Sequence, residues 1–118
     1  ILRGKWSLRE GRIVVTGDLN LVHLGLADLE ELPDICCVEG DIRVEGISKE
    51  QTANLKALPE GLRIEGVLCL VRCSELTVLP KDLHVEGDFT LLGCHKVASL
   101  PEGLHVKRSL MVGKCDAL

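Results

Sequence analysis

Aromatic side chains are nearly absent from this 118-residue chain, which has one tryptophan, one phenylalanine and no tyrosine. A globular core normally recruits more aromatic rings, because each ring buries a large apolar area. The hydrophobic fraction is nevertheless 46%. The apolar side chains are therefore mostly aliphatic, which suits a stack of narrow, similar layers better than one bulky core.

Long apolar runs and clusters of basic residues are also missing. No apolar stretch approaches the ~18 residues of a transmembrane helix, so we expect no membrane span. The 14 lysine and arginine residues are scattered and the net charge is −4, which argues against nucleic acid as a partner because a phosphate track requires clustered basic groups. The length predicts one domain. Since the chain begins with Ile1, we expect it to be part of a longer protein.

One segment repeats along the chain. Leu58, Leu79 and Leu100 each precede a proline and lie 21 residues apart. A fixed period in this range is typical of a solenoid, in which each repeat forms one coil. The clearest copies share their apolar offsets: Leu62, Ile64, Leu68, Leu70, Cys73 and Leu76; then Leu83, Val85, Phe89, Leu91, Cys94 and Val97; then Leu104, Val106, Leu110, Val112, Cys115 and Leu118.

Weaker copies extend this repeat toward the N-terminus. Leu32-Pro33 precedes Leu58-Pro59 by 26 residues, and an earlier copy begins near Ile13. The additional residues follow the second strand of the coil, where insertions into a solenoid are expected. We predict about five coils over residues 13–118, the last one incomplete, and an N-terminal cap or linker over residues 1–12.

Alternating apolar residues predict two short strands in each coil. In the clearest copies they cover residues 62–64 and 68–70, 83–85 and 89–91, and 104–106 and 110–112. Gly66 and Gly87 lie between the two strands and indicate a sharp bend. Each strand should pair in parallel with its counterpart in the next coil. The return segment after Cys73 should be irregular or 3₁₀, whereas Ser48–Lys56 could hold a short helix.

The segment from Leu68 to Pro80 reads Leu-x-Leu-x-x-Cys-x-x-Leu-x-x-Leu-Pro. It resembles the leucine-rich-repeat pattern, and in particular the short LPxxL-type repeats of bacterial effector proteins. The resemblance implies a right-handed solenoid of parallel strands within a larger bacterial protein, and binding of a protein partner through the strand face. The asparagine typical of the family is absent, and a Leu-x-Val-x-Gly run precedes the strand. The missing asparagine removes a side chain that would hydrogen-bond the turn backbone and so bears on the curvature of the coil. The second departure implies a flatter, β-rich coil with little helix.

Residues between the inward leucines of the second strand should point outward and form columns across the sheet. Several of them are apolar, and an exposed apolar patch that the fold does not require indicates an interaction site. The candidate partner-binding residues are Arg43, Val67, Cys69, Val71, Thr90, Leu92 and Met111. Alternatively, a neighbouring domain or a second copy of the chain covers the patch, and the repeats act as a structural spacer or self-associate.

The first strand of each coil should expose charged residues instead. One column contains Glu39, Glu65, Glu86 and Lys107, and the other contains Cys37, Arg63, His84 and His105. Such a charged face is usually solvated and contributes little to stability. The two histidines leave a pH-sensing role open, because histidine titrates near neutrality.

Cys73, Cys94 and Cys115 share one inward offset among the six cysteines of the chain. That position suits a small apolar side chain, so we interpret the cysteines as free and buried. Free thiols favour a reducing compartment, either the cytoplasm or the host cytosol of a delivered effector. A Cys73–Cys94 disulfide is the alternative, since stacked coils lie ~4.8 Å apart.

Catalytic and metal-binding motifs are weak. Cys94 and His95 are adjacent, but nucleophilic catalysis requires the two side chains to face each other. His23, Cys36 and Cys37 could ligate zinc, yet no C-x-x-C pair with matching partners exists. We therefore expect no enzyme activity, no catalytic residues, no metal and no cofactor.

Overall fold

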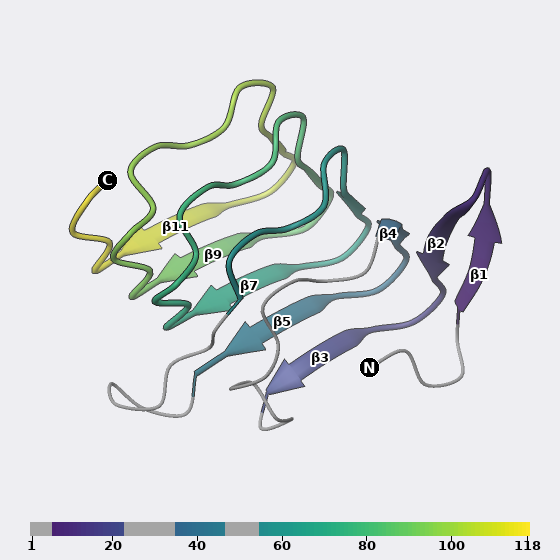
Figure 1. Cartoon of the computed structure of the whole chain (residues 1–118), viewed down its shortest axis with the longest axis horizontal. Coiled ribbons are helices and arrows are strands. Elements are labelled where there is room, and N and C mark those ends of the chain that lie inside the picture. Colours follow the sequence, from purple (N-terminus) through teal and green to yellow (C-terminus); the bar gives the residue numbers. More distant parts are fainter. Residues whose placement is uncertain (1–5, 23–34, 47–54) are drawn as a thin grey trace.

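The computed structural model describes residues 6–22, 35–46 and 55–118, with only the backbone for residues 20–22. The chain forms a β-solenoid of about four turns, and none of the described residues is helical (Figure 1). Each of the five expected coils corresponds to one strand of the five-stranded sheet. The chain makes about four turns between the first and the last of these strands. The short helix expected over Ser48–Lys56 falls largely outside the described residues.

Two sheets line the solenoid (Figure 1). The first sheet has the order β1 (Trp6–Arg9), β2 (Arg12–Val15), β4 (Ile35–Val38), β6 (Arg63–Ile64), β8 (His84–Val85) and β10 (His105–Val106). The second sheet has the order β3 (Leu19–Val22), β5 (Ile42–Glu45), β7 (Leu68–Val71), β9 (Phe89–Leu92) and β11 (Leu110–Gly113). All pairs are parallel except β1 with β2.

Residues at the same offset of the repeat occupy equivalent places in successive coils. β7 pairs with β9, and β9 pairs with β11, so that Leu68, Phe89 and Leu110 lie in one row. The strands of the three C-terminal coils lie within about one residue of the ranges that the alternation predicts. The parallel-strand solenoid and its register are therefore confirmed.

The core is filled by the inward residue of each alternation. Leu62, Ile64, Leu68 and Leu70 have 0% of their surface exposed. Burying a side chain of this kind stabilises the fold by about 1.5–3 kcal/mol. Phe89 is the largest of the fully buried side chains and lies in one row with Leu68 and Leu110.

A sharp corner joins the two strands of each coil, and adjacent coils approach closely there. The amide of Gly87 donates to the carbonyl of Gly66 (2.9 Å), and the amide of Gly66 donates to the carbonyl of Gly40 (3.0 Å). A Cβ atom added to Gly87 would lie 2.6 Å from the Gly66 carbonyl oxygen. The expected bend is confirmed, and glycine is needed because the backbone of the preceding coil fills the space.

The return segments contain tight turns, as expected from their length. The amide of Leu76 donates to the carbonyl of Cys73 (3.2 Å), and the amide of Val97 donates to the carbonyl of Cys94 (3.4 Å). The buried side chains of these segments close the third side of the core.

The two ends of the solenoid differ. At the N-terminal end, β1 turns back and pairs with β2, so that it covers the edge of the first sheet. Trp6 remains 47% exposed, so its side chain is not buried against the first coil. At the C-terminal end, Leu110 and Val112 are 42% and 40% exposed, although they occupy inward positions. They are exposed because none of the described residues forms a coil beyond β11.

Candidate functional site

The outer face of the second sheet carries two columns of side chains. The register places Arg43, Cys69, Thr90 and Met111 in one column. Glu45, Val71, Leu92 and Gly113 form the next. These are the columns that the repeat offset predicts. The side chains of Asn20 and Val22, which would extend them, lie outside the described residues.

Exposure varies strongly along the first of these columns. Arg43 is exposed and Met111 is 58% exposed, whereas Cys69 is only 9% exposed. The small cysteine side chain lies between the larger residues of the flanking strands, so it presents less surface than the sequence pattern suggests. Burial raises the pKa of the Cys69 thiol, although nearby Arg43 acts in the opposite direction. Cys69 is therefore a protonated, weakly nucleophilic thiol near neutral pH.

A groove, here called the end groove, lies where β7, β9 and β11 end. Its volume is about 660 Å³. It is lined by Val71, Arg72, Ser74, Leu92, Gly93, His95, Gly113, Lys114 and Asp116. Val71 and Leu92 are half-buried members of the second column, so the groove continues the outer face of the sheet.

Charged side chains surround the end groove. Arg72 and Lys114 follow their strands at the same offset, and both have a positive φ, 54° and 51°. The guanidinium of Arg72 donates to the carbonyl of Gly46 (Nη1–O, 3.2 Å). His95 Nδ1 lies 3.1 Å from Asp116 Oδ2, and both side chains are exposed. Arg72 and Lys114 were not among the predicted site residues, and their only signal in the sequence is a basic residue directly after a strand.

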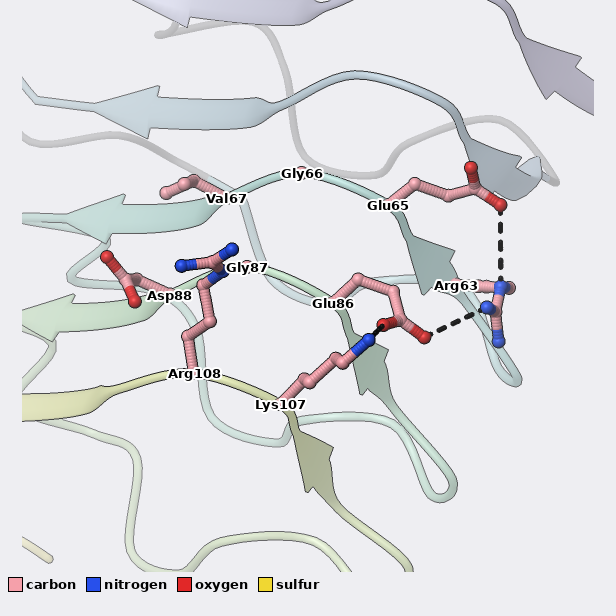
Figure 2. Close-up of a pocket in the computed structure, with 9 residues that line it drawn as sticks. All are labelled: Arg63, Glu65, Gly66, Val67, Glu86, Gly87, Asp88, Lys107 and Arg108. Carbon is pink, nitrogen blue, oxygen red and sulfur yellow. Dashed lines mark hydrogen bonds and ion pairs between the residues drawn. The ribbon is translucent and has the colours of Figure 1, made fainter.

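A second groove, here called the corner groove, lies beside the bend between the two sheets (Figure 2). It is shallow, has a volume of about 1060 Å³, and is lined by Arg63, Glu65, Gly66, Val67, Glu86, Gly87, Asp88, Lys107 and Arg108. Its basic and acidic side chains are equal in number. Of the predicted partner-binding residues, Val67 lines this groove, whereas Val71 and Leu92 line the end groove.

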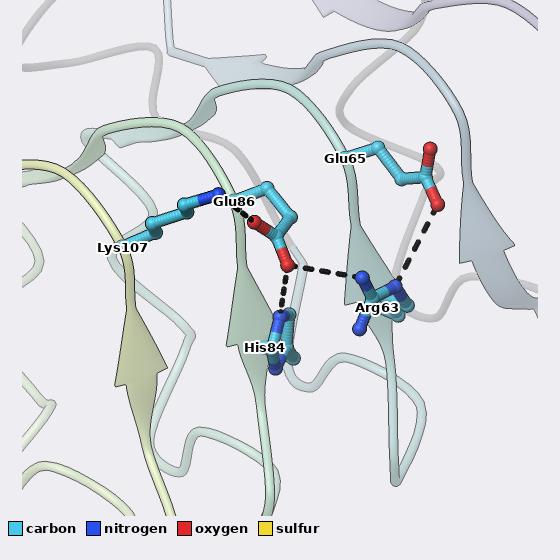
Figure 3. Close-up of polar contacts among 5 residues, drawn as sticks. All are labelled: Arg63, Glu65, His84, Glu86 and Lys107. Carbon is cyan, nitrogen blue, oxygen red and sulfur yellow. Dashed lines mark hydrogen bonds and ion pairs between the residues drawn. The ribbon is translucent and has the colours of Figure 1, made fainter.

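Glu86 is the centre of an ion-pair cluster on the outer face of the first sheet (Figure 3). His84 Nε2 and Arg63 Nη2 lie 2.6 Å and 2.9 Å from Glu86 Oε1. Lys107 Nζ lies 3.6 Å from Oε2. The hydrogen bond with His84 lowers the pKa of Glu86, and Lys107 and Arg63 act in the same direction. The charges of this face therefore neutralise one another.

The two histidines of the first sheet contact neighbouring side chains of the same sheet. The rings of His84 and His105 stack with their centroids 4.3 Å apart and 11° between their planes. His84 in addition contacts Glu86, as described above. Neither ring projects alone as a free ligand.

The inward cysteines form a single file. All six cysteines of the chain are free, and five are buried. The thiols of Cys73, Cys94 and Cys115 donate to carbonyls of the preceding coil, at Val44 (3.9 Å), Leu70 (3.7 Å) and Leu91 (3.7 Å). These thiols provide hydrogen-bond donors to backbone carbonyl groups at the position of the repeat where the leucine-rich-repeat pattern has asparagine.

Cys94 and His95 do not face each other. Cys94 is completely buried, whereas the His95 side chain is 53% exposed and contacts Asp116. One side chain points into the core and the other into solvent, so the pair lacks the geometry of a nucleophile and its base.

The described residues contain no group of three or more histidine, cysteine or acidic side chains that could hold a metal ion. His23, one of the conceivable zinc ligands, lies outside them. The described part of the chain contains no helix with the length and apolar character needed to cross a bilayer.

No protein-family model matches the chain, and neither a curated protein nor a solved structure matches it. Its repeat family and its function are therefore proposals that rest on its own residues.

Proposed function

We propose that the chain is the leucine-rich-repeat module of a larger bacterial protein, and that it binds a protein partner through the outer face of the second sheet. The contact residues in this proposal are Arg43, Val67, Cys69, Val71, Thr90, Leu92 and Met111. One observation carries it. Val71 and Leu92 form a half-buried apolar column that runs from the sheet surface into the end groove.

The two outer faces differ in what a partner would gain by docking. A partner on the first sheet would have to remove the Glu86 ion pairs from water, which costs free energy. A partner on the second sheet would cover Val71, Leu92 and Met111, and removing apolar surface from water is favourable. Stacked coils also provide the extended surface that repeat proteins use for binding.

Site-specific photo-crosslinking tests which face the partner contacts. A photoreactive amino acid is placed at Thr90 on the second sheet, and in a matched protein at His105 on the first sheet, within cells that make the protein. A discrete adduct from position 90 and none from position 105 is expected. An adduct formed only from position 105 would contradict the proposal.

The partner identified in this way then allows affinities to be measured. Met111→Glu and Leu92→Glu place a charge on the proposed surface and should weaken binding by about tenfold or more. Lys107→Glu changes the charge of the first sheet and serves as the control. Urea unfolding midpoints establish that each variant is folded. Unchanged affinity in both second-sheet variants would contradict the proposal.

Self-association is a second candidate. Val71, Leu92 and Met111 form an apolar surface on the second sheet, and a second copy of the chain that docked there would remove it from water. Light scattering over a dilution series tests the idea. A dimer that Met111→Glu converts to a monomer supports self-association, and a monomer at every concentration contradicts it.

The thiols suggest where this function is carried out. Six free cysteines persist more readily in a reducing compartment. We therefore place the module in the cytoplasm, or in the host cytosol if the protein is a delivered effector. Labelling of the thiols in intact cells would test this, since disulfide formation in the native protein would contradict it.

A further inference from the structure

The end groove has an excess of positive charge in a chain whose net charge is −4. Arg72 and Lys114 line it together with a single acidic residue, Asp116. Asp116 is already paired with His95 (3.1 Å). The ammonium group of Lys114 makes no ion pair within the described residues. An anionic group that entered the groove would therefore meet a cation that is not yet neutralised.

We propose that the end groove binds an acidic side chain of the partner, together with an aliphatic side chain next to it in the partner's sequence. This inference rests on the proposed function of the second sheet. The aliphatic side chain packs on Val71 and Leu92, and the carboxylate meets Lys114 at the rim. Charge-assisted contacts of this kind fix the register of the bound segment, while the apolar floor supplies affinity.

Gly113 lets Leu92 lie flat along the groove. It occupies the third place in the column of Val71 and Leu92. A Cβ atom at Gly113 would lie 2.8 Å from Cδ2 of Leu92. Its φ lies outside the left-handed region, so the backbone does not require glycine there. The end of the Leu92 side chain instead packs over the backbone of Gly113, so Leu92 forms the floor on which an incoming aliphatic group would lie.

The two cations occupy positions where glycine would be the less strained choice. Arg72 and Lys114 have φ values of 54° and 51°, and the equivalent residue of the coil between them is Gly93, with φ 66°. A non-glycine residue in this region is strained, because its Cβ lies too close to the following carbonyl oxygen. Long basic side chains occupy two of the three positions and bring positive charge to the groove.

Fluorescence anisotropy with labelled peptides tests the proposal on the intact chain. The probe is a short, acetylated and amidated peptide in which leucine alternates with glutamate. Matched peptides carry glutamine or lysine in place of glutamate. The glutamate peptide should bind saturably, about tenfold more tightly than the glutamine peptide, and less tightly at high salt. Equal binding of all three peptides overturns the proposal.

Three variants separate charge, shape and long-range attraction. Lys114→Glu reverses the charge and Gly113→Val fills the groove. Each variant should lower the affinity for the glutamate peptide by about tenfold or more. Lys81→Glu alters the net charge equally but lies outside the groove, so it should bind as the wild type does. If Lys81→Glu weakens binding as much as Lys114→Glu, the attraction is long-range and the groove site is wrong.

The failure of this inference can be told apart from the failure of the proposed function. If no peptide binds saturably while Met111→Glu still weakens binding of the crosslinked partner, the groove proposal fails and the sheet surface stands. If the glutamate peptide binds through Lys114 while Met111→Glu and Leu92→Glu leave the partner unaffected, the groove proposal stands and the sheet surface fails.

Discussion

The Oδ1 atom of Asp41 accepts a hydrogen bond from the backbone amide of Val67, one coil further along, at 2.7 Å. The contact recurs along the solenoid. Asp18 Oδ1 accepts from the amide of Asp41 (2.8 Å), and Asp88 Oδ1 accepts from the amide of Ser109 (3.0 Å). Each carboxylate satisfies a backbone donor at the corner, where the sheet ladder is interrupted.

Asp41→Ala should destabilise the protein by about 1–3 kcal/mol, because the Val67 amide then loses its partner in a part-buried position. Asp41→Asn keeps an oxygen acceptor and should cost less. Asp116→Ala is the control, since the Asp116 side chain is 82% exposed, and its effect should stay within about 0.5 kcal/mol. Urea denaturation measures all three. Equal effects of Asp41→Ala and Asp116→Ala would mean that the corner contact does not stabilise the fold.

Gly87→Ala and Gly113→Ala form a matched pair for testing the packing between coils. At Gly87 the new Cβ would meet the carbonyl oxygen of Gly66 at 2.6 Å, and backbone cannot rotate away. At Gly113 the new Cβ would meet only the end of the Leu92 side chain, and this side chain can rotate away. We expect Gly87→Ala to lower the unfolding free energy by about 1–3 kcal/mol and Gly113→Ala to have a much smaller effect. Equal unfolding midpoints would contradict the close approach at the corner.

The fold was predictable because its signals recur at a fixed offset. Leu68, Phe89 and Leu110 lie in one row because each coil repeats the same alternation. The sequence therefore contains several independent copies of one pattern, and each copy supports the others. The N-terminal hairpin was not predicted, since Trp6–Arg9 has no counterpart elsewhere in the repeat.

The candidate surface was only partly predictable. Its columns followed from the offset, but exposure depends on neighbours in other coils. Cys69 lies between Arg43 and Thr90 of the flanking strands and is only 9% exposed, and Val67 lines the corner groove. Arg72 and Lys114 are basic and follow the strands in a left-handed backbone conformation. The apolar alternation that predicts the strands therefore does not include them.

Alkaline pH should destabilise the protein through Cys73. The neighbouring thiol of Cys94 and burial away from water both raise the pKa of Cys73. The folded state therefore keeps this proton at pH values where the unfolded chain, with a thiol pKa of about 8.5, has lost it. Stability is then fully present below about pH 8.5 and falls by up to about 1.4 kcal/mol per pH unit above it. Urea unfolding midpoints across this range measure the fall.

Cys73→Ala supplies the comparison for the alkaline experiment. The variant loses packing in the core, so its stability at neutral pH should be lower. Its stability should nevertheless depend less steeply on pH above about 8.5 than that of the wild type. The same slope in both proteins would show that Cys73 does not cause the alkaline loss.

Acid should act through Glu86, in the opposite direction. Its pKa is lowered by the hydrogen bond with His84 and by the charges of Lys107 and Arg63. A carboxyl group with a lowered pKa stabilises the folded state above its unfolded value of about 4.3, and this contribution is lost as the pH falls. Glu86→Gln should therefore flatten the loss of stability as the pH falls below about 5, which thermal unfolding across this range can measure.

His84→Ala shows whether the hydrogen bond causes this acid dependence. Removing the imidazole takes away the contact at 2.6 Å, while Arg63 and Lys107 still face the carboxylate at 2.9 Å and 3.6 Å. Because the His84 contact is the main cause of the lowered pKa of Glu86, this variant should reproduce most of the flattening seen in Glu86→Gln. If His84→Ala instead keeps the wild-type acid dependence while Glu86→Gln flattens it, the two cations and not the histidine hold the carboxylate in its charged form.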